Sequence, residues 1–122
     1  MRKAIFITLT LVFGLFINLS LAQDAKTIQL EQTTGEFTIH SLTLAEGNYV
    51  FEITNNGIDH EVGFVLAPKG KTDQANHIKE AYVQKTIKNG ESSTSKTVAL
   101  TKGEYVYFCP LNPTPQYTIT VK

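Results

Sequence analysis

Two side chains in the sequence carry the chemistry of a soft-metal site, the imidazole of His60 and the thiol of Cys109. His60 follows a glycine-containing turn and precedes an apolar stretch, whereas Cys109 ends an aromatic stretch and begins a proline-rich loop. A thiolate and an imidazole, held by rigid strand ends, are ligands that copper prefers. Because Cys109 is the only cysteine, it forms no disulfide within the chain and is either shielded, paired with another chain or used.

Both residues also have a purely structural interpretation, and the sequence leaves it open. A free cysteine is most often a small buried hydrophobe, which is the competing role for Cys109. His60 stands between Asp59 and Glu61, so it is equally well explained as a polar loop residue between two carboxylates.

No catalytic constellation accompanies these two residues. The sequence has no Ser-His-Asp arrangement, no glycine-rich phosphate loop and no Cys-x-x-Cys pair, and its acidic residues are scattered beside turns. Of the other histidines, His40 fits a partly exposed strand position. His77 lies on a predicted helix, from which it would have to swing in to supply a second imidazole. We therefore expect a protein without enzymatic activity.

The first 22 residues have the features of a secretory signal peptide. Two basic residues precede an apolar run over 4–21, and Ser20-Leu21-Ala22 supplies the small residues of a cleavage site before Gln23. A transmembrane anchor is the competing interpretation, since the run is nearly long enough to span a bilayer. The polar residues after the run favour cleavage. We expect residues 23–122 to form a single domain, periplasmic or secreted and without a membrane span after signal removal.

The charge of the remaining chain argues against nucleic acid as a partner. The sequence has 11 basic and 11 acidic residues, and removal of Arg2 and Lys3 with the signal leaves nine basic against eleven acidic. A nucleic-acid-binding domain would show a basic stripe instead. A protein partner or a redox partner is the remaining expectation, and the sequence does not name it.

The sequence predicts that short strands separated by turns position His60 and Cys109. Alternating or continuous apolar stretches, bounded by turn residues, are typical of a sandwich or barrel. In the best defined of them, Tyr49, Phe51 and Ile53 share one face. We predict about seven strands, over residues 37–40, 42–44, 49–54, 62–66, 96–100, 104–108 and 116–121.

One segment, residues 73–85, lacks the alternation of apolar and polar residues that is typical of a strand. Its apolar residues are spaced three and four apart, and Asp73 stands where an N-cap would be; the apolar residues are Ala75, Ile78, Ala81 and Tyr82. This spacing predicts a short amphipathic helix inserted between strands.

Three motifs give the chain from about residue 35 to 122 a resemblance to the cupredoxin family, the blue-copper fold of plastocyanins and azurins. They are Val50-Phe51-Glu52-Ile53-Thr54-Asn55-Asn56-Gly57, Asp59-His60-Glu61-Val62-Gly63-Phe64 and Gly103-Glu104-Tyr105-Val106-Tyr107-Phe108-Cys109. The resemblance implies an all-β, Greek-key cupredoxin-like sandwich with copper at one end. It also implies that His60 is the first copper ligand and Cys109 the second.

The loop after Cys109 departs from the family pattern. Asn112 stands where the second histidine is expected, and no methionine follows it. Gln116 is able to replace a weak axial methionine, since that bond is long. An amide oxygen from Asn112 is a poor replacement for imidazole, and Tyr117 would have to bind as a phenolate. The candidate copper ligands that follow from the resemblance are therefore His60, Cys109, Asn112 and Gln116.

Two functions from different classes follow from this incomplete set. The first is an exported cupredoxin-like module used for binding, whose copper site is lost or altered. The second is a copper-binding protein or small electron carrier with an atypical third ligand. A third hypothesis, weaker than both, is a two-coordinate Cu(I) site formed by His60 and Cys109. The redox role requires a His₂Cys set, so we favour the binding module.

Overall fold

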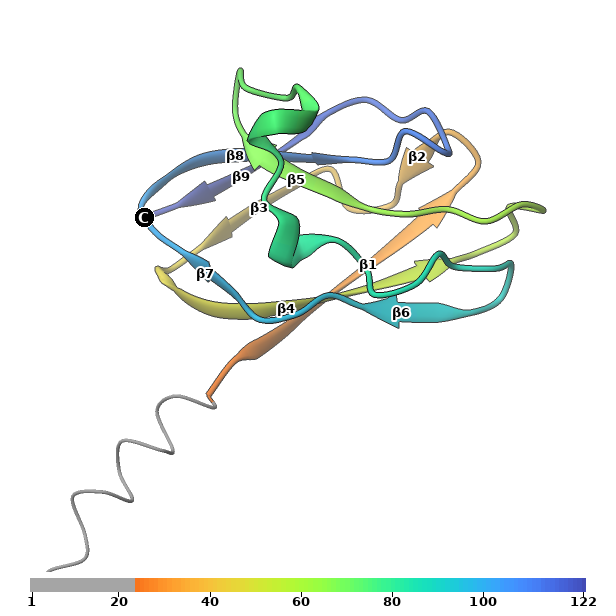
Figure 1. Cartoon of the computed structure of the whole chain (residues 1–122), viewed down its shortest axis with the longest axis horizontal. Coiled ribbons are helices and arrows are strands. Elements are labelled where there is room, and N and C mark those ends of the chain that lie inside the picture. Colours follow the sequence, from red (N-terminus) through yellow and green to blue (C-terminus); the bar gives the residue numbers. More distant parts are fainter. Residues whose placement is uncertain (1–23) are drawn as a thin grey trace, which may run out of the picture.

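The computed structural model describes residues 24–122, which form a sandwich of two β-sheets (Figure 1). The predicted signal peptide, residues 1–22, lies outside the described residues. Within residues 24–122, none of the helices has the length and apolar character needed to cross a membrane. Two lone 3-10 turns are the helical elements of this part of the chain.

The first sheet has the order β2-β1-β4-β6, and β7 also pairs with β4. Its long strands β1 and β4 run parallel, and the other pairs are antiparallel. The bounds are β1 Lys26–Thr33, β2 Glu36–Phe37, β4 Gly47–Asn55, β6 Ser92–Thr94 and β7 Val98–Leu100.

The second sheet has the order β3-β9-β8-β5. Strands β3 and β9 run parallel, whereas β8 is antiparallel to both of its neighbours. The bounds are β3 Ser41–Leu44, β5 Val65–Pro68, β8 Gly103–Phe108 and β9 Tyr117–Val121. The loop that follows β8, the β1–β2 turn and the segment between β4 and β5 lie together at the end of the sandwich opposite the C-terminus (Figure 1).

The core between the sheets follows from the alternation of apolar residues. Along β4, Tyr49, Phe51 and Ile53 are buried as predicted, while the residues between them face outward. Between the sheets, the ring of Phe37 from β2 meets that of Tyr107 from β8 edge to face, with centroids 5.1 Å apart. Such edge-to-face pairs add to the stabilisation from buried area, so this aromatic cluster fixes how the sheets pack.

The helix predicted over residues 73–85 is wrong as one continuous element. Two single 3-10 turns stand in its place, η2 Gln74–Asn76 and η3 Lys79–Ala81, and Asp73 makes no capping hydrogen bond through its side chain. The backbone of this segment bonds to the sheets instead, because Ile78 N–H donates to the Leu66 carbonyl at 2.8 Å and Val83 bridges to Ser95. These bonds to other segments take the place of the bonds that a helix makes within itself.

Strand β1 was missed by the sequence analysis. It contributes eight residues and pairs with β4 over seven of them. Its polar composition hid it, although Ile28, Leu30 and Gln32 alternate toward the core. The strand predicted over 62–66 also begins later, at Val65, because Val62 forms an isolated bridge with Ile87 before the sheet starts.

Candidate functional site

Cys109 directly follows β8 and is buried, with 1% of its surface exposed. Its Sγ accepts a hydrogen bond from the backbone N–H of Gly63 at 3.3 Å. Its own N–H donates to the hydroxyl of Thr114 at 3.2 Å, which closes the start of the loop. The thiol therefore lies between the end of β8 and the segment before β5.

Asn112, in the same loop, is 3% exposed and held by three hydrogen bonds. Its Oδ1 accepts from the N–H of Gly35 at 2.7 Å. Its Nδ2 donates to Oε1 of Gln32 and to the carbonyl of Thr33, both at 3.0 Å. Both N–H donors of the amide are thus engaged with the end of β1, and its oxygen is engaged with the β1–β2 turn.

Gln32 connects this amide to the thiol. It is fully buried, and its Nε2 donates to the carbonyl of Gly63 at 2.7 Å while its Oε1 accepts from Asn112. Because the N–H of Gly63 bonds the Sγ of Cys109, one chain of hydrogen bonds runs from Gly35 to the thiol. We call Gly35, Asn112, Gln32, Gly63 and Cys109 the amide network. Gln32 was missed by the sequence analysis, and its place two residues after the buried Leu30 in an alternating stretch is the signal that would have found it.

His60 is exposed and is not part of the amide network. Its Nδ1–H donates to the carbonyl of Glu61 at 3.1 Å, because a carbonyl oxygen only accepts. The residue lies in an open groove with Asp59, Glu61, Lys88 and Asn89, which we call the His60 groove. The structure thus gives the two residues that carried the copper prediction different surroundings.

The buried side chain of Asn55 explains why His60 lies at the surface. Its Nδ2 donates to the carbonyls of Ile58, His60 and Ile87 at 3.0 to 3.1 Å, and its Oδ1 accepts from Ile58 N–H at 2.9 Å. These bonds fold residues 55–60 into a tight turn around one amide. The backbone of His60 is therefore fixed inward, and its side chain projects outward.

Gln116, the remaining predicted ligand, and two further residues considered from the sequence, Tyr117 and His40, have the following surroundings. Gln116 is exposed. Tyr117 is buried, and its hydroxyl accepts a long hydrogen bond from Phe37 N–H at 3.4 Å. His40 lies outside the strands and is exposed, with its imidazole 3.6 Å from the carboxylate of Glu36.

His77, the residue considered as a replacement second imidazole, is held at both ring nitrogens. Its Nε2–H donates to the carbonyl of Thr72 at 3.0 Å, and this fixes the tautomer in which Nδ1 accepts from the hydroxyl of Tyr82 at 2.8 Å. The ring of Phe108 lies edge-on to the imidazole, 6.0 Å away. These contacts position His77 as a structural residue under η2.

The residues present do not fit a type 1 copper centre. Within the described residues, no group of three or more His, Cys, Asp or Glu side chains is placed so as to hold a metal ion. The trigonal plane of such a centre requires two imidazoles beside the thiolate. Asn112, the residue predicted to stand in place of the second histidine, has its amide engaged by β1 and the β1–β2 turn.

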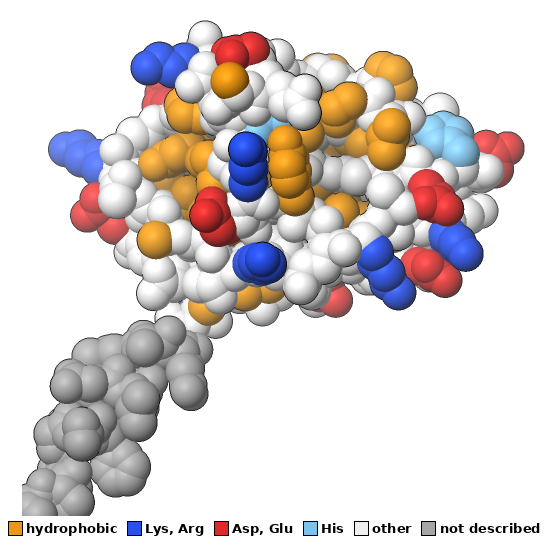
Figure 2. All heavy atoms as spheres, viewed as in Figure 1, with side chains coloured by type: hydrophobic (Ala, Val, Ile, Leu, Met, Phe, Trp, Pro, Cys, Tyr) orange, Lys and Arg blue, Asp and Glu red, His pale blue; other side chains and the backbone are white. Residues whose placement is uncertain are grey.

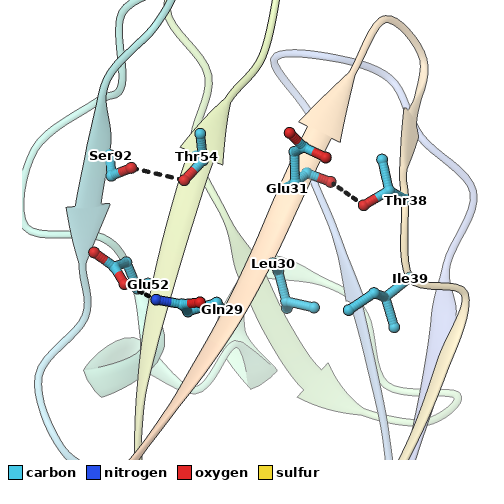
Figure 3. Close-up of a pocket in the computed structure, with 8 residues that line it drawn as sticks. All are labelled: Gln29, Leu30, Glu31, Thr38, Ile39, Glu52, Thr54 and Ser92. Carbon is cyan, nitrogen blue, oxygen red and sulfur yellow. Dashed lines mark hydrogen bonds between the residues drawn. The ribbon is translucent and has the colours of Figure 1, made fainter.

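A second hollow lies on the outer face of the first sheet, beside β1, β4 and β6 (Figure 3). Four of its polar side chains form two pairs across strands. Gln29 Nε2 donates to Glu52 Oε1 at 2.9 Å, and the hydroxyls of Thr54 and Ser92 are 2.6 Å apart. The hollow is thus lined by cross-strand pairs that satisfy each other. On the face shown in Figure 2, charged side chains of both signs are scattered and do not gather in one patch.

Comparison with known proteins identifies the family and the fold. A family model for a cupredoxin-like domain matches residues 4–121. Auracyanin A, a "blue" copper protein from Chloroflexus aurantiacus, is similar in structure over 81% of this chain and 100% of its own, with a TM-score of 0.65 and 17% identity. Auracyanin B is similar over 80% of this chain and 89% of its own, with a TM-score of 0.62 and 21% identity.

A third similar structure is the dithionite-reduced auracyanin of Roseiflexus castenholzii. It covers 80% of this chain and 98% of its own length, with a TM-score of 0.61 and 17% identity. No curated protein matches the sequence. At these identities, the likeness to the auracyanins establishes a shared fold.

Proposed function

The chain belongs to the family of cupredoxin-like domains, and from this membership we propose that it is an exported binding module whose type 1 copper site is incomplete. The all-β Greek-key sandwich expected from the sequence is the fold of this family and of the auracyanins that resemble it. In this proposal the fold serves as a scaffold for binding, and the protein does not transfer electrons through a blue copper centre.

The observation that carries the proposal is the engagement of Asn112. In a copper carrier, the residue at this position supplies an imidazole that faces the metal. In this chain the residue is an amide with three hydrogen bonds to β1 and the β1–β2 turn, including one to the fully buried Gln32. These bonds hold the loop after Cys109 to β1 and the β1–β2 turn through protein groups.

The closed loop presents an apolar surface for a protein partner. Leu111 is 52% exposed, although its neighbours Cys109 and Asn112 are buried. The side chain of Leu111 lies close to Gly63. If Gly63 carried a Cβ, that atom would be 3.9 Å from Cδ1 of Leu111. A side chain carried by a rigid loop loses little conformational freedom on binding, which favours association.

The metal part of the proposal is tested by titrating the purified, reduced protein with Cu(II) and following the visible spectrum and the bound metal. We expect no intense thiolate-to-copper band and no stoichiometric Cu(II). Asn112→His is expected to create no colour, because the network that holds position 112 is not arranged around a metal. An intense band at one equivalent that disappears in Cys109→Ser would contradict the proposal and favour the alternative, a copper protein with an atypical third ligand.

The binding part is tested with two matched surface variants. Leu111 and Ile39 are the large hydrophobic residues exposed within residues 24–122, at 52% and 38%. Immobilised wild-type protein, Leu111→Ser and Ile39→Ser are incubated with the envelope fraction of the producing cell. A partner retained by the wild type and by Ile39→Ser but lost from Leu111→Ser would support docking on the loop. Equal retention by all three would exclude this surface.

A further inference from the structure

Two Asn-Gly sequences, Asn56-Gly57 and Asn89-Gly90, lie side by side at the end of the sandwich that holds the His60 groove. Both asparagines are exposed. The N–H of Gly57 donates to Oδ1 of Asn89 at 3.0 Å, and the N–H of Gly90 donates to the carbonyl of Asn55 at 2.8 Å. Each glycine nitrogen that follows an asparagine is therefore engaged by the other turn.

These nitrogens are the nucleophiles of asparagine deamidation. The backbone nitrogen of the following residue attacks the side-chain Cγ, the Cγ–Nδ2 bond breaks, and ammonia leaves with the proton of the backbone amide. Water then opens the succinimide ring to aspartate or isoaspartate. Glycine favours the reaction because it has no Cβ to hinder the attack and is free to adopt the required backbone angles. A backbone nitrogen whose N–H is held in a hydrogen bond is not available for this attack.

We infer that Asn56 is a latent deamidation site whose reactivity is controlled by the side chain of Asn89. The Gly57 nitrogen attacks Asn56 only when its bond to Asn89 Oδ1 opens. A second contact adds to this protection, since Asn56 Nδ2 donates to Oε2 of Glu31 at 2.8 Å and this holds the amide toward β1. Both contacts are exposed to water, so local opening breaks them without unfolding the sandwich.

Asn89 is better protected than Asn56, although its sequence context is the same. Its nucleophile, Gly90 N–H, bonds the main-chain carbonyl of Asn55. Asn55 is fully buried, and its side chain is anchored to the carbonyls of Ile58, His60 and Ile87. Opening this bond requires movement of a buried turn, whereas Gly57 N–H is held by one surface side chain. The first modification is therefore expected at Asn56.

Deamidation at Asn56 would act on the amide network through the backbone. The N–H of Asn56 donates to the carbonyl of Gln32 at 2.9 Å, directly beside the buried amide that contacts Gly63. An aspartate at position 56 would bring a carboxylate against Glu31, and an isoaspartate would also lengthen the backbone by one atom. Both products are expected to unfold at a lower temperature than the unmodified protein.

The test follows deamidation of the purified protein at pH 8 and 37 °C by peptide mass spectrometry, which detects the gain of one dalton at each site. In the folded wild type, Asn56 is expected to react at least about tenfold more slowly than in urea, the factor that one protected hydrogen bond supplies. Asn89→Ala is expected to raise the rate at Asn56 in the folded protein by up to about tenfold, because the Gly57 N–H is freed.

Asn89→Asp is the matched control, because it keeps an oxygen that accepts from Gly57 N–H and is expected to leave Asn56 slow. Equal rates at Asn56 in the folded and urea-unfolded wild type would overturn the inference. An unchanged rate in folded Asn89→Ala would also overturn it. If Asn89→Ala does not fold, amide hydrogen exchange of Gly57 in the wild type decides: protection supports the inference, and exchange at the rate of an open chain refutes it.

Discussion

The amide network around Cys109 and the His60 groove lie at the same end of the sandwich but are built in opposite ways. The network is continuous, each member bonds the next, and its side chains (Gln32, Asn112 and Cys109) are buried. The groove is open, and within residues 24–122 the imidazole of His60 bonds only the neighbouring carbonyl of Glu61. Cys109 is thus part of the core, whereas His60 lies at the surface.

The segment that follows His60 accounts for the different surroundings of the two residues. Val62 exchanges two backbone hydrogen bonds with Ile87, at 3.0 and 2.9 Å. Gly63 follows with one bond to Cys109 Sγ and one to Gln32. The backbone of residues 62 and 63 is thus saturated, and it fixes which groups approach the thiol. The comparison teaches that two residues of ligand type differ in their surroundings because the hydrogen bonds of the chain between them determine where each side chain lies.

The comparison is tested most strongly by removing Asn112. Asn112→Ala leaves Gly35 N–H, Gln32 Oε1 and the Thr33 carbonyl without this partner, so we expect a loss of about 2–4 kcal/mol in the free energy of unfolding. Urea unfolding followed by circular dichroism measures it. Asn112→Asp keeps the acceptor for Gly35 and loses the two donated bonds. A loss below about 0.5 kcal/mol in Asn112→Ala, the range of ordinary surface changes, would show that the network contributes little.

The second prediction concerns access to the thiol of Cys109. At 1% exposure, Cys109 in the folded protein is expected to react with a thiol reagent at least about tenfold more slowly than in urea, because reaction requires an opening that costs more than one hydrogen bond. Asn112→Ala is expected to raise this rate, because it loosens the loop that covers the thiol. His60→Ala, on the other side of the comparison, is expected to leave it unchanged. An equal increase in both variants would mean that the groove also shields Cys109.

The sequence predicted the parts of the molecule that depend on regular patterns. The alternation in β4, the aromatic strand β8 and the last strand β9 were recognised because their apolar residues face a core at a period of two. Strand β1 was not, because its pairing with the distant β4 determines its conformation more than its own polar residues do. The helix over 73–85 was predicted wrongly for the same reason, since bonds to other segments replace those within it.

The candidate site was less predictable than the fold. Sequence reasoning identified Asn112 as the residue that departs from the family pattern, but it had no means to find its partners, which lie 77 to 80 residues away. Hydrogen bonds between such distant residues exist only after the sheets assemble. The roles of Gln32 and Gly63 as the link to Cys109 follow from the same assembly.

Tyr107, two residues before Cys109, gives a third test. Burial, with a smaller contribution from the neighbouring Tyr117, raises the pKa of Tyr107 to about 12 from 10.0. The folded state therefore holds the proton more tightly than the unfolded state. Its contribution to stability is complete below pH 10 and is lost as the pH rises from about 10 to about 12. Urea unfolding across this interval should show a steeper fall in wild type than in Tyr107→Phe. Parallel curves would contradict this ionisation.

The smallest effect is expected from His60→Ala. The one hydrogen bond that fixes the turn at this residue is accepted by its backbone carbonyl from Asn55 Nδ2, and truncating the side chain leaves that bond in place. The imidazole itself is exposed, so the free energy of unfolding should change by no more than about 0.5 kcal/mol. Asn55→Ala is the matched variant in the same turn, and it should lose about 1–3 kcal/mol because it removes the amide around which the turn folds. If urea unfolding shows comparable losses for both variants, the imidazole of His60 contributes to the buried structure, and the contrast between groove and network fails.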